Sequence, residues 1–133
     1  MSGAPTELLA KVKLFSDLDP RELKEIAGAM NEISYVPGQV VLSEGAGGVG
    51  FFIIAEGKAK VTVEGGDVRA LGPGDYFGEI ALIADTRRSA TVTAETPLTC
   101  WGLASWAFRP IVASNSSIAW KLLQALARLL SDR

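Results

Sequence analysis

The chain has 133 residues, a formal net charge of −2 and a hydrophobic fraction of 48%. This length and composition fit one globular domain with a core of its own, and they exclude a disordered chain. The charge excludes a broad basic surface for nucleic acid or for an anionic membrane, so we expect no direct nucleic-acid binding.

The chain contains no histidine and one cysteine, Cys100. Without histidine, neither a Ser-His-Asp or Cys-His catalytic centre nor a His-ligated metal site can form, so we expect no enzyme, no metal and no cofactor. A lone cysteine cannot make an internal disulfide, which favours a reducing cytoplasm. Met1–Pro5 has no signal-peptide pattern, and no apolar run approaches the roughly 20 residues that span a bilayer, so we expect a cytoplasmic protein.

Apolar residues at helical spacing predict two packing helices within residues 1–32. The first follows Thr6, which we assign as its N-cap. In the second, Asp19 can cap the helix, Pro20 suits the first position, and Glu22 completes a capping box. The apolar residues of the two helices are Leu8, Leu9, Val12 and Phe15, and Leu23, Ile26, Ala27 and Met30.

Between residues 33 and 103, short β-rich runs alternate with turns of Gly, Pro and Asp. Residues 65–67 resemble a hairpin turn, and residues 72–75 a second sharp turn. Ala59, Val61 and Val63 alternate with polar residues, as in a half-buried strand. The pattern predicts a mainly β fold, an antiparallel β-barrel of the jelly-roll type with flanking helices. The glycine-rich segment 45–50 lacks the Gly-Lys-Ser/Thr of a phosphate-binding loop and is interpreted as a hairpin.

Residues 104–133 return to helix, with a break at the capping residues 114–117. The last helix is apolar except for a narrow polar stripe: Lys121, Gln124, Arg128 and Ser131. It holds more apolar surface than one barrel wall could bury, so it is either a buried terminal helix or one that also meets a ligand or second subunit. The tryptophans, Trp101, Trp106 and Trp120, are expected in the core, and Cys100 as an inert buried thiol.

The segment Phe77–Val92 contains the candidate site. Gly78 would let a ligand approach the backbone, and the free amides of a short helix over 79–83 would form an anion site. Strand alternation places Arg88 on the inner side, where an arginine is costly unless an anion meets it. Glu79 can accept a sugar hydroxyl. A ribose with a singly charged cyclic phosphate would satisfy all three features.

The same segment resembles the phosphate-binding cassette of the cyclic-nucleotide-binding domain family. The family pattern is Phe-Gly-Glu-Leu/Ile-Ala-Leu, a short gap, then Arg-Ala/Ser/Thr-Ala, and the spacing from Glu79 to Arg88 matches without insertion. Residues 35–38, 51–57 and 71–75 also look like family landmarks, so nearly the whole chain is covered as one domain, 1–133.

The resemblance implies a role for each matching position. Arg88 would hold the cyclic phosphate and Glu79 the ribose 2′-hydroxyl. The remaining ligand contacts would come from the backbone of Gly78, Ile80 and Ala81, from Ser89 and Ala90 beside the phosphate, and from Val61 and Leu71 in the apolar wall near the base. Residues 126–130 of the last helix would act as a lid over the purine.

One departure concerns Arg87, which stands where the family often has proline; alternation favours Arg88 as the phosphate ligand. Ser89 lies between the small apolar residue of many cAMP readers and the threonine associated with cGMP, and we favour cAMP over cGMP. The resemblance thus implies a non-catalytic sensor that binds a cyclic nucleotide and signals through the C-terminal helix to an effector protein or a homodimer partner.

Two alternatives remain open. Glu79 and Arg88 could form a structural ion pair in a ligand-independent scaffold or dimerisation domain. The chain could also be a regulatory piece of a larger transcription factor, kinase or channel.

Overall fold

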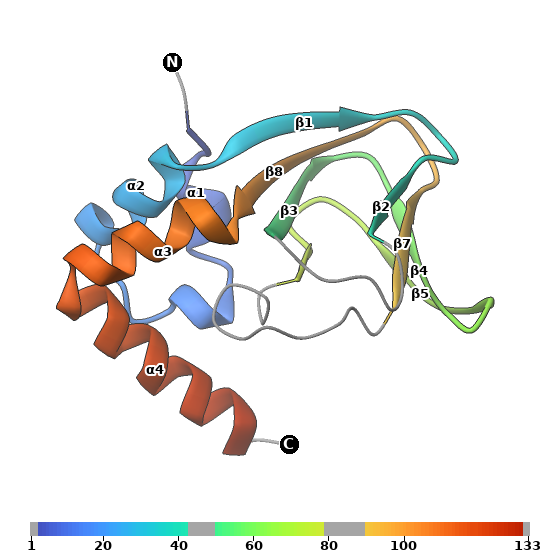
Figure 1. The fold of residues 1–133 in the computed structure, drawn as a ribbon. Helices are drawn as coiled ribbons and strands as arrows, with labels where there is room; N and C mark the ends of the chain where they lie inside the picture. Colours follow the sequence, from blue (N-terminus) through green and yellow to red (C-terminus); the bar gives the residue numbers. More distant parts are fainter. Residues whose placement is uncertain (1–2, 43–49, 79–89, 132–133) are drawn as a thin grey trace.

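The computed structural model describes residues 3–42, 50–78 and 90–131 of the chain. Helices gather on one side of the molecule and strands on the other (Figure 1). The helices and their bounds are α1 (Thr6–Leu9), the 3-10 helix η1 (Lys13–Phe15), α2 (Pro20–Gly28), α3 (Ser105–Ser114) and α4 (Ser116–Ser131). Among these described helices, none combines the length and apolar character that crossing a membrane requires.

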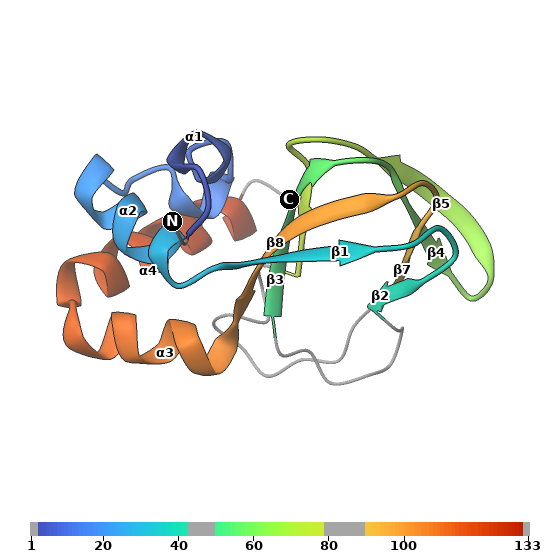
Figure 2. The ribbon, with the colours of Figure 1, turned by 90° about the horizontal axis from the view of Figure 1, so that it is seen from above.

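The strands form two antiparallel sheets of four strands each in the described part of the chain. Their orders are β1-β8-β3-β6 and β2-β7-β4-β5, and Figure 2 shows the second sheet at the end away from the helices. This arrangement confirms the predicted mainly β fold with flanking helices. The strands are β1 (Asn31–Tyr35), β2 (Val40–Leu42), β3 (Gly50–Glu56), β4 (Ala59–Val63), β5 (Gly66–Leu71), β6 (Tyr76–Phe77), β7 (Thr91–Ala94) and β8 (Leu98–Ala104).

Two apolar clusters hold these elements together. The helical-side cluster packs α1, η1, α2, α3 and α4 against one face of β3 and β8, and it includes Phe15, Ile26, Phe51, Phe108 and Leu122. The barrel cluster lies between the two sheets. Its buried members are Ile54, Ala59, Leu71, Phe77, Val92, Ala94, Leu98 and Cys100.

The N-terminal helices differ in how well their local sequence predicts them. In α2 the capping box is present: Glu22 N donates to Asp19 Oδ1 at 2.9 Å, and Asp19 N donates to Glu22 Oε1 at 3.0 Å. The first helix is shorter than predicted, and its N-cap is Pro5 rather than Thr6, whose side chain lies inside the first turn. The expected apolar contacts are nevertheless made, because α1 and η1 bury Leu9 and Phe15 completely.

The β4–β5 hairpin turns one residue earlier than predicted. Val63 pairs with Gly66, so the turn consists of Glu64 and Gly65. Both have positive φ, 53° and 80°, as a two-residue type I′ turn requires. Gly66 and Asp67, predicted as turn residues, belong to strand β5.

The break between α3 and α4 falls within residues 114–117, as predicted. Asn115 is extended, and its Oδ1 accepts hydrogen bonds from the backbone N–H of Ser117 (3.1 Å) and Ile118 (3.2 Å). The prediction for the tryptophans is wrong at two positions. Trp106 is 73% exposed and Trp120 is 59% exposed, because both point away from the clusters that their helices cover.

Candidate functional site

Gly78 marks the entrance to the predicted cassette. It follows β6, which pairs with β3 through Phe77 opposite Phe52 and Tyr76 opposite Ile53. The rings of Phe52 and Phe77 are stacked, with centroids 5.4 Å apart. Gly78 has φ +85°, a left-handed conformation that side chains disfavour and glycine adopts freely. The glycine predicted for close backbone approach thus has a backbone conformation that other residues rarely adopt.

The turn before β6 fixes this entrance to the barrel wall. Asp75 Oδ2 accepts a hydrogen bond from Gly72 N at 2.8 Å and closes the turn. Gly74 N donates to Ile54 O (2.8 Å), and Ile54 N donates to Asp75 O (2.9 Å). Because each of these bonds either closes the turn or reaches β3, the chain enters the cassette from a defined position on the first sheet.

The cassette ends at β7, in the second sheet. Val92 pairs with Val61 of β4 and with Leu42 of β2. Val92 is 3% exposed and Ala94 1%, whereas Thr91 and Thr93 are half-buried, which confirms the predicted inward side for Val92. Ala90 is half-buried and lies in a bend before the strand rather than within it. The two ends of the cassette therefore adjoin different sheets, at β6 and at β7.

The structure places four of the nine predicted ligand-binding residues. Gly78 and Ala90 lie near the two ends of the cassette. Val61 and Leu71 lie on β4 and β5 of the second sheet, and these two strands pair with each other. The other five lie outside the described residues, so their roles stay predictions, as does the short helix at 79–83. They are Glu79, Ile80, Ala81, Arg88 and Ser89.

Val61 and Leu71 both belong to the predicted apolar wall. Leu71 is 3% exposed within the barrel cluster, and Val61 is half-buried against that cluster. Among the described residues of this cluster, the side chains with polar atoms are Tyr35 and Cys100. Burial raises the pKa of both, that of Cys100 to about 12, so both stay neutral at physiological pH. The two polar groups within this apolar wall therefore carry no charge.

The Cys100 thiol is also fully buried, as predicted. Across residues 3–42, 50–78 and 90–131, His, Cys, Asp and Glu form no group of three that could hold a metal ion.

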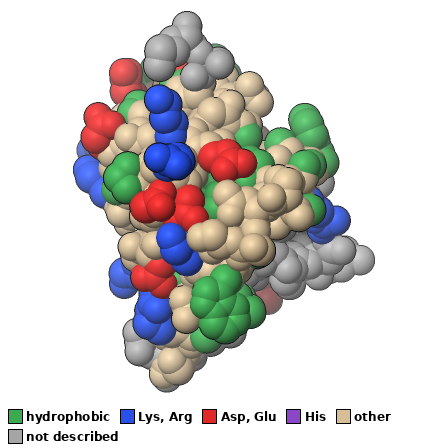
Figure 3. Space-filling model, turned by 90° about the vertical axis from the view of Figure 1, so that its left-hand side faces the viewer, with side chains coloured by type: hydrophobic (Ala, Val, Ile, Leu, Met, Phe, Trp, Pro, Cys, Tyr) green, Lys and Arg blue, Asp and Glu red, His purple; other side chains and the backbone are tan. Residues whose placement is uncertain are grey.

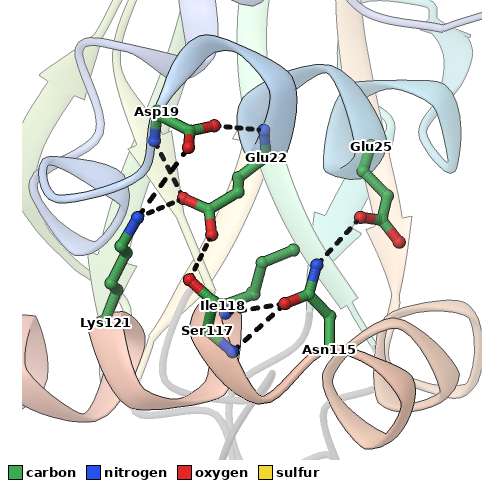
Figure 4. A network of polar contacts seen from close by, with 7 residues as sticks. All are labelled: Asp19, Glu22, Glu25, Asn115, Ser117, Ile118 and Lys121. Carbon is green, nitrogen blue, oxygen red and sulfur yellow. Dashed lines mark hydrogen bonds and ion pairs between the residues drawn. The ribbon is translucent and has the colours of Figure 1, made fainter.

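A second polar centre, which the sequence did not predict, joins α2 to α4 on the helical side (Figure 4). Both carboxylate oxygens of Glu22 accept hydrogen bonds from α4: Oε1 from Lys121 Nζ at 2.6 Å and Oε2 from Ser117 Oγ at 2.7 Å. The Lys121 bond, followed by those from Asp19 N and Ser117, lowers the pKa of Glu22 to about 2 despite burial. The capping pattern revealed one of these contacts, and no local signal indicated the other two.

The residues predicted as a lid pack on the helical side in this structure. Leu126 and Leu129 of α4 contact the helical-side cluster, and the described side chains of the barrel cluster include none from α4. The side chain of Leu130 lies outside the described set.

Comparison with known proteins identifies the family. The model of the cyclic nucleotide-binding domain matches residues 32–115. The chain is 43% identical over 94 residues to a cGMP-dependent protein kinase of Eimeria tenella, and 44% identical over 92 residues to a cAMP-dependent protein kinase regulatory subunit of Yarrowia lipolytica. These alignments cover 71% and 68% of this chain but only 9% and 24% of the relatives' lengths.

Solved structures agree with this assignment. The N-terminal domain of a transcriptional regulator from Streptomyces coelicolor A3(2) superposes with a TM-score of 0.86 at 28% identity, covering 94% of this chain and 91% of that one. A cyclic nucleotide-binding-like protein from Brucella abortus superposes with a TM-score of 0.75 at 28% identity, covering 81% and 97%. The fold, the family model and the two kinase-related sequences lead to the same conclusion: the chain belongs to the cyclic nucleotide-binding domain family.

Proposed function

We propose that this domain is a sensor that binds a cyclic mononucleotide, cAMP in preference to cGMP, at the segment Phe77–Val92. The observation that supports this most is the way the segment is held: its two ends are fixed on different sheets, around an apolar interior. The apolar side chains of Val61 and Leu71 at this wall would suit a purine, and they would leave the phosphate to residues of the cassette. Arg88 is the proposed phosphate ligand and Glu79 the proposed acceptor for the ribose hydroxyl.

The proposed mechanism is a population shift between two positions of α4. In this structure α4 packs on η1 and α3, away from the barrel cluster. A nucleotide in the cassette would favour a second arrangement, in which the end of α4 covers the base. An effector protein that contacts α4 could then sense the ligand.

Calorimetric titration with cAMP and with cGMP tests this proposal. Arg88→Ala should weaken binding by about 2–4 kcal/mol, the scale of a lost charge partner in a desolvated contact. Arg87→Ala is the matched control: it removes the same charge one position away, and we expect no more than a threefold change, a shift of about 0.6 kcal/mol. No heat and no thermal stabilisation with either nucleotide would contradict the sensor function, and so would equal losses in the two variants.

A ligand-independent scaffold is the second candidate function, and the exposed apolar residues of α3 and α4 favour it. Trp106, Trp120 and Leu123 are 73%, 59% and 57% exposed. Leu123 also lines a groove of about 470 Å³ between the two helices. A second copy of the chain could cover this surface. Light scattering across a range of concentrations, with and without cAMP, tests it; a monomer under every condition would count against it.

A further inference from the structure

Two cations of the polar stripe of α4 contact the N-terminal part of the chain. Lys121 and Arg128 lie on this stripe, two turns apart, and each meets an acidic residue of the N-terminal part. Lys121 Nζ is 2.6 Å from Glu22 Oε1, and Arg128 Nη2 is 2.6 Å from Asp17 Oδ2. Figure 3, which views the helical side, shows acidic and basic side chains close together there. Lys121 and Arg128 thus help to fix the position of α4.

Glu22 is the centre of this contact. Its exposed fraction is 7%, and among the described residues it is the one with a charged side chain that is buried. Its own capping box orients the carboxylate, because Oε1 also accepts from Asp19 N at 3.0 Å. Ser117 and Lys121 then meet a carboxylate whose position is already set by α2. We call Glu22, Ser117 and Lys121 the α2–α4 clamp.

The two clamp bonds are of the strong kind. A hydrogen bond to an ionised carboxylate is roughly twice as strong as one between neutral groups. The Asp17–Arg128 pair is more exposed, with side chains 32% and 54% exposed, and contributes less. Apolar contacts of α4 through Ile118, Leu122 and Ala125 support the same position. The clamp therefore adds a specific polar contribution to an otherwise apolar interface.

From these contacts we propose that the α2–α4 clamp holds α4 on the N-terminal helices in the ligand-free domain and thereby opposes its movement onto the barrel. This inference rests on the proposed function, in which α4 closes over the nucleotide. If closure requires α4 to leave α2, the two bonds to Glu22 must break first. The apparent association constant for the ligand is then the intrinsic constant multiplied by the fraction of domains in which α4 is free.

Lys121→Met removes the cation of the clamp and keeps the length of the side chain. We expect the apparent affinity for cAMP, measured by calorimetry, to rise by about tenfold, because a larger fraction of the domain can close. Lys24→Met is the matched control, since Lys24 is an exposed lysine of α2 outside the clamp; its affinity should stay within twofold. An unchanged or weaker affinity for Lys121→Met would overturn the proposal. A contact that only stabilises the fold would leave the affinity unchanged, and a contact that α4 needs in order to close would give a weaker one.

Glu22→Gln provides an independent route to the same state. The amide oxygen can still accept from Asp19 N, so the cap of α2 is kept while the Glu22–Lys121 ion pair is lost and the longer Lys121–Asp19 pair, at 4.0 Å, remains. We expect a similar gain in affinity, and the double variant with Lys121→Met should gain little more than either single variant, because both remove one interaction. Additive gains would contradict a shared clamp.

Hydrogen exchange on the ligand-free domain separates this proposal from the proposed function. Backbone amides of residues 116–131 should exchange faster in Lys121→Met than in wild type or Lys24→Met, while the amides of β3 and β8 stay unchanged. If wild type binds neither nucleotide, the sensor function fails, and faster exchange in α4 still supports the holding role of the clamp. Unchanged exchange in α4 overturns that role whether or not a nucleotide binds.

Discussion

Glu22 Oε1 and Lys121 Nζ lie 2.6 Å apart although 99 residues separate them in the chain. The contact joins the first turn of α2 to the second turn of α4, so the N-terminal and C-terminal helices form one packed unit beside the barrel (Figures 1 and 4). The hydrogen bond between them raises the pKa of the Lys121 ammonium and lowers the pKa of the Glu22 carboxylate. Each partner therefore stabilises the charged form of the other.

Unfolding at acidic pH measures this contact. The pKa of Glu22 falls from its ordinary value of 4.5 to about 2 in the folded domain. Its contribution to stability is therefore complete above about pH 5 and is lost as the pH falls from there towards 2. We expect urea unfolding to show a loss of about 1–2 kcal/mol over this range from Glu22, after allowance for solvent screening at the partly exposed Lys121.

Glu22→Gln supplies the control for that measurement. The amide carries no charge to pair with Lys121, so the variant should be less stable than wild type at pH 7. Because the amide does not titrate, this difference in stability should shrink as the pH approaches 2 and Glu22 of the wild type becomes protonated. A constant difference between the two proteins at every pH would show that Glu22 keeps its ordinary pKa in the folded state.

Gly57, in the turn between β3 and β4, should not accept a side chain. Its φ is +93°, and a Cβ there would lie 2.1 Å from Pro97 O and 3.0 Å from Leu98 Cα. Because both atoms belong to the backbone, they cannot move aside as a flexible side chain would. Gly57→Ala should lower the free energy of unfolding by about 2–4 kcal/mol in chemical denaturation, the range of strained backbone and overpacking combined.

Gly28→Ala is the matched control for Gly57→Ala. A Cβ at Gly28 meets nothing within 4 Å, and the residue ends α2 without positive φ. Alanine there should be neutral or stabilise by up to about 1 kcal/mol. If the two variants were equally stable, the turn at Gly57 would be looser than the structure indicates.

Local signals predicted the parts of the fold that local atoms determine. The capping box of α2 spans Asp19 to Glu22, and both of its hydrogen bonds form. The break at Asn115 is likewise made by a side chain that caps the next helix. In both cases the partners lie within four residues, so sequence spacing alone specifies the contact.

Pairing between distant strands overruled other local predictions. The glycines at 65 and 66 indicated the centre of a hairpin, but the register of β4 with β5 places Glu64 in the turn with φ 53°. Glu64 is not a residue that favours this conformation, and the pairing of Val63 with Gly66 places it in the turn.

The partners of polar and aromatic residues on α4 could not be predicted either. Helical periodicity gives the stripe with Lys121 and Arg128, but it cannot show that Glu22 and Asp17, respectively 99 and 111 residues earlier in the chain, contact these two cations. The same limit applies to Trp120, since a helix apolar on most sides has no periodicity that separates its buried face from an exposed one.

For the candidate site, the sequence prediction can be compared with the structure at the two ends of the cassette. Gly78 has positive φ, which requires glycine for a different reason from the predicted close approach of a ligand, and Val92 faces inward as alternation requires. The alternation argument for Arg88 extends four residues before Val92, past the bend at Ala90. Glu79 and Arg88 therefore stay predictions that rest on the cassette motif.

Ser89 should set the ratio of cAMP to cGMP affinity. The family resemblance places it beside the phosphate cradle, where its hydroxyl could accept a hydrogen bond from the guanine amino group, which adenine lacks. One such bond contributes about 0.5–1.5 kcal/mol. Ser89→Ala should therefore weaken cGMP about two- to tenfold and leave cAMP within twofold, as measured by competitive titration. Ser89→Thr keeps the hydroxyl and restricts its rotamers, so it should shift the ratio towards cGMP. Parallel changes for both nucleotides in the two variants would mean that Ser89 contacts only what the two ligands share, and that selectivity arises elsewhere in the site.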